Sequence, residues 1–370
     1  MNFDFSDEQK MLRDQARSFL EDKCTSQTVR TILEGDEPYD KELWAGIAEM
    51  GFLGAAIPEE FGGLGLGHLE LCVIAEEVGR VVAPVPFSSS VYLATEALLA
   101  AGSDSQKSAW LPKLAAGEAI GTFAVAEGNK PATAKNVNAS FDGSSLTGTK
   151  VAVPDGDVAD VAIVAAKSAK GTALVLVDLN GPGVSRRNLR TVDPTRSYAE
   201  LTFEGAPAEL IGDDGEGWSL KERVFDRAAV LMAFEQVGGS QSALEMAKEY
   251  AMGRIAFGRS IASFQAIKHK LADMYIKTEL ARSNAYYGAW ALSTDAPELP
   301  VAAAGARVAA IEAYGFAAQE NVQAHGGIGF TWEADCHLHY RRARNLNLAL
   351  GSGRVWKDAL VTRLEQRNAA

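Results

Sequence analysis

The sequence has few cysteines, and their spacing excludes several classes of protein. Only three occur, Cys24, Cys72 and Cys336, far apart and without a CxxC pair. Disulfide frameworks use more cysteines, and zinc sites bring them in close pairs. We therefore expect buried thiols in a reducing compartment. His337 and His339 lie near Cys336, but residues two apart on a helix point in different directions, so no metal site is predicted.

Basic residues are also in deficit. Lys and Arg number 36 against 48 Asp and Glu, which gives a formal net charge of −12. Such a surface argues against nucleic-acid binding, because phosphate contacts need a basic face. No apolar run approaches the roughly 20 residues of a membrane span. The opening MNFDFSDEQK is too polar for a signal peptide. We expect a cytoplasmic protein.

The chain does contain strong helical patterning at both ends. Ser6 and Gln9 form a capping box before an apolar stripe, and Asp40 is placed to cap a later helix. The middle of the chain differs, because its segments are short, β-branched and separated by turn signals. The predicted fold is α+β and mostly helical, with an N-terminal helical domain (1–118), a small antiparallel β domain (119–212) and a C-terminal four-helix-type bundle (213–370).

Two motifs in the C-terminal half combine polar side chains with glycines. One reads Arg-Ile-Ala-Phe-Gly with a glutamine seven residues later, and the other reads Gln-Ala-His-Gly-Gly. A guanidinium offers a planar fork of donors to a pyrophosphate, and glycines let backbone amides approach a phosphate. Either motif alone is more compatible with a solvated helix end than with a cofactor site. Together they favour cofactor contacts by Arg254, Phe257, Gly258, Gln265, Gln323, Gly326 and Gly327.

Several stretches together resemble the acyl-CoA dehydrogenase family over essentially the whole chain. They are FSDEQKMLRDQARSFL, PEEFGGLGLG, QKSAWLPKLAAGE and the two motifs just described. The resemblance implies an FAD enzyme that oxidises an acyl-CoA thioester between Cα and Cβ, usually within a tetramer. It also implies electron-transfer flavoprotein as the acceptor. In that family the two motifs reach the FAD of the neighbouring subunit.

The resemblance breaks down at the catalytic base. Removing a proton from Cα of a thioester needs a carboxylate. The two places where the resemblance puts that carboxylate are occupied here by Leu350 and Ala228, so no catalytic residue is assigned. Glu235 and Asp226 lie nearby in sequence and are the candidates for a relocated base. Their alternative role is that of an ordinary helix carboxylate.

The flavin-ring contacts are missing as well. The resemblance implies a Thr-Glu-Pro-x-x-Gly-Ser pattern and a Trp-Ile-Thr strand in the β domain. The chain reads AEGNKPAT at 126–133 and Ala-Val-Pro at 152–154 instead. The lost contacts are therefore those that a subunit makes to its own flavin, and the retained contacts are those made to a neighbour's flavin.

This asymmetry leads to one leading hypothesis and two alternatives. The chain is predicted to be the catalytically silent subunit of an α2β2 acyl-CoA dehydrogenase, completing the FAD site of a second, base-bearing subunit. The resemblance implies bulky CoA esters, such as those of steroid side chains, as substrates. The first alternative is a competent homotetramer with a relocated base. The second is a structural or acyl-CoA-binding protein without flavin.

Overall fold

The computed structural model describes residues 5–369 and divides them into two compact units. The helical unit contains the described residues up to Thr31, His68–Ala83, and the chain from Ala229 onward. The sheet unit contains Ile32–Gly67 and Pro84–Ala228. The chain passes between the units several times, whereas the three predicted domains follow one another in order. Their boundaries stay a prediction.

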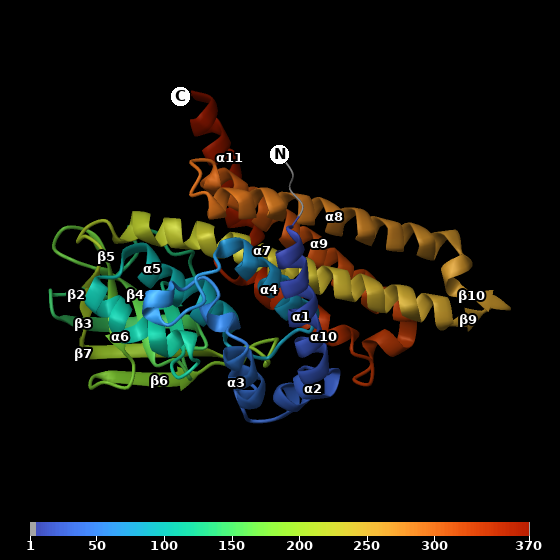
Figure 1. Ribbon diagram of the computed structural model, residues 1–370, viewed down its shortest axis with the longest axis horizontal. Coiled ribbons are helices and arrows are strands. Elements are labelled where there is room, and N and C mark those ends of the chain that lie inside the picture. The colour runs from blue at the N-terminus through green and yellow to red at the C-terminus, as the bar shows by residue number, and fades with distance from the viewer. Residues whose placement is uncertain (1–4, 370) are drawn as a thin grey trace. The chain divides into compact units, whose positions relative to one another are not determined.

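The sheet unit is built on eight strands in the order β6-β7-β3-β2-β4-β5-β8, with β1 beside β4 (Figure 1). The strands are β1 (Gly121–Ala124), β2 (Ser140–Phe141), β3 (Ser145–Pro154), β4 (Val161–Lys167), β5 (Thr172–Asp178), β6 (Val184–Asn188), β7 (Tyr198–Pro207) and β8 (Glu209–Ile211). Most neighbours are antiparallel, as predicted, but β4 lies parallel to both β1 and β2. Parallel neighbours are not joined by hairpins, so turn signals do not reveal them.

Burial explains the residue pattern of this unit. β4 and β5 are each buried at six consecutive positions, which accounts for apolar runs such as VAIVAA. The π-helix η3 (Ser88–Thr95) is buried throughout and packs against β1 and β4. The remaining helices of the unit are α3 (Lys41–Glu49), α5 (Glu96–Ala101), α6 (Asp104–Ala115), and the 3-10 helices η1 (Phe52–Gly54) and η2 (Glu59–Phe61).

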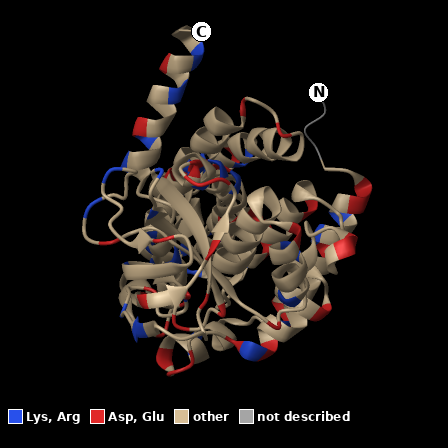
Figure 2. Ribbon diagram, turned by 90° about the vertical axis from the view of Figure 1, so that its left-hand side faces the viewer, with Lys and Arg blue, Asp and Glu red and all other residues tan. Residues whose placement is uncertain are grey.

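Long helices make up the helical unit. They are α1 (Asp7–Lys23), α4 (His68–Arg80), α8 (Gln265–Ser293), α9 (Leu299–His325), α10 (Cys336–Leu348), α11 (Gly353–Ala369) and the larger part of α7 (Gly217–Gly253). The short helix α2 (Ser26–Glu34) begins in this unit. The mostly helical α+β class is confirmed. Acidic and basic residues alternate along α11 (Figure 2), which shows a solvated surface.

The predicted start signals act as expected. The hydroxyl of Ser6 accepts the backbone N–H of Gln9, and the Gln9 side chain accepts the N–H of Ser6, which caps α1. Asp40 accepts the N–H of Leu43 at 2.8 Å and caps α3. The three cysteines are buried and form no disulfide within the described chain.

Two glycines set how closely α4 and α7 cross. A Cβ on Gly79 would lie 1.8 Å from the carbonyl oxygen of Glu235, and a Cβ on Gly238 would lie 1.9 Å from that of Glu76. Each glycine therefore packs directly on the backbone of the other helix, where any side chain would clash. This crossing holds the backbone of Glu235 in the interior of the unit.

One stretch, Leu299–Phe330, is long and apolar enough to cross a membrane by length and composition, although no such run was expected. Of its most apolar window, 61% is buried within the structure. Alanines at helical spacing, among them Ala303, Ala306, Ala310 and Ala313, are buried along α9. This burial is typical of the core helix of a bundle, and α9 packs against α8, α10 and α11.

Candidate functional site

Three long helices bring the two predicted motifs to one end of the helical unit. α7 ends at Gly253, α8 begins at Gln265 and α9 ends at His325. Since α8 runs back along α7, and α9 runs back along α8, these three helix ends meet (Figure 1). The Tyr250 ring on α7 stacks on the His325 ring, with centroids 4.1 Å apart. The structure therefore brings the two motifs together.

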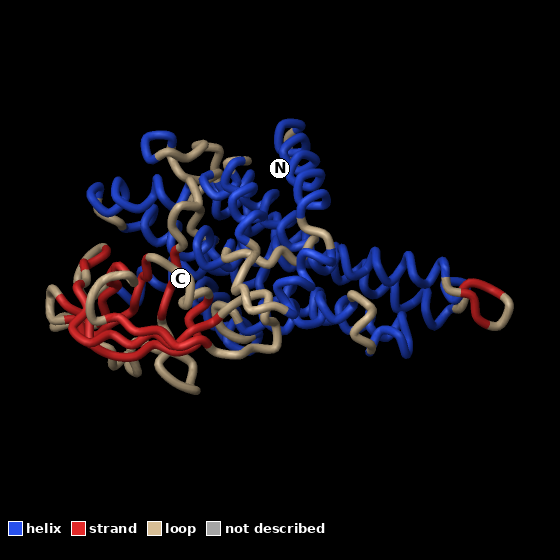
Figure 3. The backbone as a smooth tube through the Cα atoms, turned by 90° about the horizontal axis from the view of Figure 1, so that it is seen from below, coloured by secondary structure: helices blue, strands red, loops and turns tan. Residues whose placement is uncertain are grey.

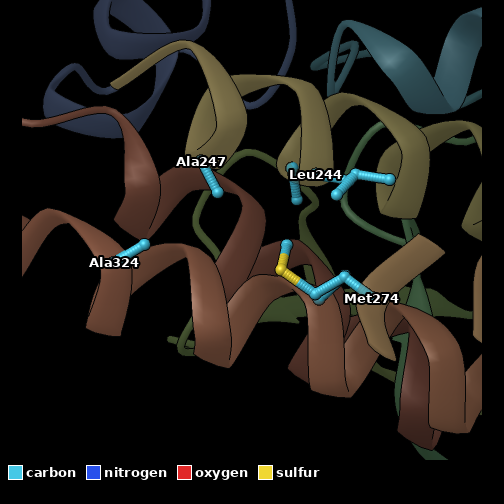
Figure 4. Packing of buried hydrophobic residues seen from close by; sticks show 6 residues of the cluster. Leu244, Ala247, Met274 and Ala324 are labelled. Carbon is cyan, nitrogen blue, oxygen red and sulfur yellow. The ribbon is translucent and has the colours of Figure 1, made fainter. Parts of the chain in front are cut away.

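Small side chains hold these helices close just behind the motifs. Leu244 and Ala247 on α7, Met274 on α8 and Ala324 on α9 belong to one buried cluster (Figure 4). Alanine contributes little volume, so the helix axes can approach closely at this level. The cluster fixes the three helix ends relative to one another, and the motif residues are attached to those ends.

A short hairpin joins α7 to α8 and exposes an aromatic ring. β9 (Ile255–Ala256) pairs with β10 (Arg259–Ser260). Phe257 and Gly258 form the turn with φ of 54° and 77°, and two successive positive φ values are typical of a type I′ turn. The hairpin lies at the tip of the helical unit (Figure 3). The Phe257 side chain is 95% exposed. A bulky residue in this backbone region is strained, and strain of this kind is common at functional positions.

Further apolar side chains are exposed at the same end. Met252 precedes the hairpin, Ile255 lies in its first strand, and Ile328 and Phe330 follow the second motif. Phe330 lies at the end of the 3-10 helix η5 (Gly326–Phe330) and is 79% exposed. Exposed apolar side chains grouped in this way are typical of interaction surfaces.

Hydrogen-bond donors gather here as well. Arg254 is exposed, and within residues 5–369 its guanidinium makes no hydrogen bond or ion pair. α8 begins at Gln265 without a side-chain cap, which leaves its first N–H groups and the positive end of its dipole open. The guanidinium of Arg259 lies 4.1 Å from the ring centroid of Phe264 nearby. In an acidic chain, these donors suit a pyrophosphate.

The glycines at 326, 327 and 329 are glycine for different structural reasons. Gly326 has a φ of 63°, which favours glycine. A Cβ on Gly329 would lie 2.4 Å from the carbonyl oxygen of Val322. Gly327 has neither constraint, and a Cβ there would meet nothing within 4 Å in the described chain. Its missing side chain, next to the exposed Gln323, fits a position that another molecule approaches.

Neither of the two positions expected to hold the catalytic base carries a carboxylate, and the two positions differ in their surroundings. Ala228 on α7 is fully buried. Leu350 follows α10, is half-buried and has a left-handed φ of 61°. Gly351 after it has a φ of 106°. Neither Ala228 nor Leu350 offers a titratable group, so neither can accept a proton from carbon.

The candidates for a relocated base are buried. Glu235 has no exposed surface, and its Oε1 lies 3.7 Å from Nη1 of Arg342. Arg342 is itself buried and donates to the carbonyl oxygens of Val82 and Ala83 at 3.2 Å. Asp226 is 5% exposed. A buried carboxylate held beside a guanidinium favours a structural role for Glu235 over proton transfer to a substrate.

An ion pair between Lys150 and Glu127 anchors the segment 126–133, in which the expected flavin-ring contacts are missing. Lys150 on β3 is fully buried and donates to Glu127 at 2.6 Å, and burial lowers the pKa of Lys150. Glu127 also accepts the N–H groups of Asn138 and Ala139. Burial opposes ionisation of Glu127, but these hydrogen bonds outweigh it and lower its pKa. Ala152, where the resemblance implies tryptophan, has a φ of 50° at a bulge in β3.

The two neighbouring histidines serve different partners. His339 is buried, with Nδ1 3.1 Å from the hydroxyl of Tyr314. Burial lowers the pKa of His339 to about 4. The His337 ring instead stacks on Trp332, with centroids 4.6 Å apart. The pair therefore does not converge on one ligand.

Known proteins match this architecture closely. The acyl-CoA dehydrogenase N-terminal domain matches residues 6–118, and the acyl-CoA dehydrogenase C-terminal domain matches residues 215–364. Acyl-CoA dehydrogenase IpdE2 of Mycobacterium tuberculosis is 35% identical over 351 residues, which is 94% of each chain. The chain belongs to the acyl-CoA dehydrogenase family. It is thus a relative of oxidoreductases that act on CH–CH bonds.

Two solved structures share the whole fold of this chain. A chain of the ChsE4-ChsE5 complex from Mycobacterium tuberculosis superposes with a TM-score of 0.89 at 30% identity, covering 100% of this chain and 99% of that one. A chain of a Tcur3481-Tcur3483 steroid ACAD variant superposes with a TM-score of 0.90 at 29% identity, covering 98% and 99%.

The sequence analysis did not predict that three basic side chains of this chain are buried. Arg342 lies within a short basic run that reads as a solvated face, yet it is 1% exposed. Lys150 is a charged residue in strand β3, where a lysine is expected on the exposed face, yet it is fully buried. Arg307 is fully buried on α9. A lone arginine in an alanine-rich helix is a usable signal for a buried charge, whereas the other two give no local sign.

Proposed function

We propose that this chain is the catalytically silent subunit of a heterotetrameric acyl-CoA dehydrogenase and completes the FAD site of a base-bearing partner subunit. One observation carries the proposal. The donors at the end of α7, α8 and α9 face away from their own chain, while both base positions hold apolar residues. A subunit that contributes only to a neighbour's cofactor site needs such donors. It does not need a catalytic base of its own.

Each motif residue would have a defined task at the subunit boundary. FAD, when bound, accepts the hydride that leaves Cβ. The guanidinium of Arg254 and the open N–H groups at Gln265 would bind its pyrophosphate. The backbone at Gly326 and Gly327 would approach the same group, and Gln323 would hydrogen-bond beside it. Phe257 and Gly258 would place the hairpin tip against the partner. The partner would supply the carboxylate and the ring contacts.

Relatives support the pairing and the class of substrate. ChsE4-ChsE5 is a complex of two differently named chains, and this chain resembles one of them along its full length. The Tcur3481-Tcur3483 protein is described as a steroid ACAD. We infer that the mixed complex acts on CoA esters with bulky, steroid-like acyl groups. We also infer that electron-transfer flavoprotein accepts the electrons and that the complex works in the cytoplasm.

Co-expression with a base-bearing acyl-CoA dehydrogenase encoded nearby tests the proposal. Alone, the chain is expected to be colourless and inactive. The mixed complex is expected to be yellow and active, with half as many FAD molecules as chains, measured by flavin absorbance after denaturation. A yellow, active homo-oligomer would instead establish the relocated base. A protein that stays colourless with every partner would establish the flavin-free alternative.

Two arginine variants separate the interface from general stability. Arg254→Ala is expected to strip most of the FAD from the mixed complex, because the pyrophosphate loses its bidentate partner. Arg187→Ala is the matched control, since Arg187 is an exposed arginine of the sheet unit paired with Glu200. It should leave the flavin content unchanged. A mixed complex that keeps full FAD occupancy after Arg254→Ala would show that these residues do not bind the cofactor.

A further inference from the structure

A pocket of about 150 Å³ lies within the helical unit, and none of the residues that line it belongs to either motif. It is formed where the ends of α1 and α4 meet α2, the middle of α7 and the start of α10. Apolar side chains make up most of its wall, namely Val29, Val81, Val82, Met246 and Leu338. A cavity of this volume accommodates a molecule about the size of benzene.

One side of the pocket is polar. The His339 ring is buried and lines the pocket. Its Nδ1 lies 3.1 Å from the hydroxyl of Tyr314, which does not line the pocket. Nε2 faces a pocket residue instead, with the hydroxyl oxygen of Ser242 at 3.4 Å. That distance is long for a hydrogen bond to a ring nitrogen, so a molecule in the pocket can offer Nε2 a closer partner.

The imidazole of His339 is neutral at pH 7. Burial, with a smaller contribution from the charge of Arg342, lowers the pKa of His339 to about 4. In a neutral imidazole one nitrogen donates and the other accepts, and a hydroxyl group can pair with either. A hydroxyl therefore suits Nε2 whichever nitrogen carries the proton, whereas an ammonium group can only donate and a carbonyl can only accept.

The two charged residues that line the pocket are already paired. Arg80 donates to the carboxylate of Glu245 at 2.8 Å, and Asp335 accepts from Arg30 at 2.7 Å. Both remain partly exposed, so they lie on the open side of the pocket. An ion that entered would lose its water for an apolar wall and would find each charge neutralised, which is unfavourable. The pocket therefore favours a neutral molecule.

The wall of the pocket also contains a strained residue. Val82 has a φ of 53°, in the left-handed region that β-branched residues rarely adopt. Its carbonyl oxygen accepts a hydrogen bond from Arg342 at 3.2 Å, which holds this conformation. Strain of this kind is common at functional positions. Here it coincides with a pocket and a buried neutral histidine.

We propose that this pocket binds a small neutral molecule with a compact apolar body and one hydroxyl group, such as a phenol or an alcohol of about six carbon atoms. The apolar body packs against the valines and Leu338, and the hydroxyl hydrogen-bonds to Nε2 of His339. The pocket shares no residue with the cofactor motifs, so the proposal does not rest on the proposed function.

Methyl resonances of the full chain, labelled with methyl-¹³C methionine, test the site directly. Phenol and toluene are titrated separately, because they have the same size and differ in the hydroxyl. Phenol is expected to shift the Met246 resonance saturably through its ring current, while Met50 of the sheet unit stays in place. The loss of a resonance in Met246→Leu identifies Met246. If neither probe shifts Met246, or if all methionines shift alike, the site is wrong. Binding of toluene without binding of phenol would overturn the hydroxyl assignment.

Variants then locate the two probes within the pocket. Ser242→Leu fills the pocket and should raise the Kd of both probes about tenfold or more, whereas Ser283→Leu, at an exposed serine of α8, should leave both unchanged. His339→Phe should weaken phenol about fivefold, the factor that one hydrogen bond contributes, and spare toluene.

Unchanged phenol binding in Ser242→Leu would overturn the site. Equal losses of phenol and toluene in His339→Phe would overturn the bond to His339. None of these outcomes depends on FAD content, so the proposed function can fail separately.

Discussion

The end of the helical unit that carries Arg254 and the interior around Glu235 both contain polar groups, but they differ in what satisfies them. Arg254 is exposed, and Gly327 faces open space. Glu235 is fully buried and lies beside Arg342. The guanidinium of Arg254 has no partner among residues 5–369, whereas the carboxylate of Glu235 is paired with a guanidinium inside the fold. Sequence position made Arg254 a cofactor ligand and Glu235 a candidate for a relocated base, and the difference in burial now separates the two residues.

The largest effect is expected at the helix crossing next to Glu235. Gly79→Ala places a Cβ 1.8 Å from the Glu235 carbonyl oxygen, so the free energy of unfolding should fall by about 4 kcal/mol or more. Gly315→Ala on α9 is the control, because its Cβ would meet nothing within 4 Å. It should stabilise the helix by about 0.5–1 kcal/mol. Urea unfolding of both variants measures this, and equal stabilities would contradict the close crossing.

Glu235→Gln should be the next most damaging change. It removes a buried charge and leaves Arg342 without it, which costs about 3 kcal/mol of unfolding free energy. Glu245→Gln on the same helix is the control, because Glu245 is 47% exposed and pairs with Arg80, and a loss under about 1 kcal/mol is expected. Loss of dehydrogenase activity at unchanged stability would instead identify Glu235 as a base and overturn its structural role.

The lowered pKa of His339 predicts how the stability of the helical unit depends on pH. Its pKa is about 4 in the folded chain, compared with about 6.5 unfolded. As pH falls through this window, the unfolded chain binds the proton and the folded chain does not. Stability is therefore full above pH 6.5 and is lost on acidification, by an amount on the order of 3 kcal/mol. Unfolding of His339→Gln should lack this component, whereas exposed His269→Gln should keep it.

The smallest effect on stability is expected at the open end. Gly327→Ala should leave the unfolding free energy unchanged but lower the FAD content of the mixed complex, because its Cβ enters the space that a ligand would use. Gly329→Ala, two residues away, should lower stability by about 1–3 kcal/mol, since its Cβ meets the Val322 carbonyl oxygen. Thermal unfolding and flavin absorbance together measure the contrast. A destabilising Gly327→Ala would show that this glycine serves the fold.

Local patterns in the sequence predict the helices well. The helical patterning predicted at both ends of the chain corresponds to α1, α3 and the long helices α7 to α11, because apolar spacing and helix caps act within one or two turns. The capping box at Ser6 is a local signal of the same kind. Joining the two motifs at one end required only that helices α7, α8 and α9 alternate in direction.

Long-range pairings could not be predicted in the same way. The pair of Lys150 and Glu127 joins β3 to a loop 23 residues earlier. Arg342 binds the carbonyls of Val82 and Ala83, some 260 residues away in sequence. Neither residue carries a local sign of its partner, since a lysine in a strand or an arginine in a basic run reads as solvated. The parallel neighbours of β4 were missed for the same reason.

The meeting of three helix ends also limits how this protein can change in length. One residue inserted into α7, α8 or α9 would rotate everything beyond it by about 100° and shift it by about 1.5 Å along the axis. The side chains of Arg254 and Gln323 would then no longer face the same point, although both would still be present. Homologous chains that use this end should therefore keep the lengths of these helices fixed.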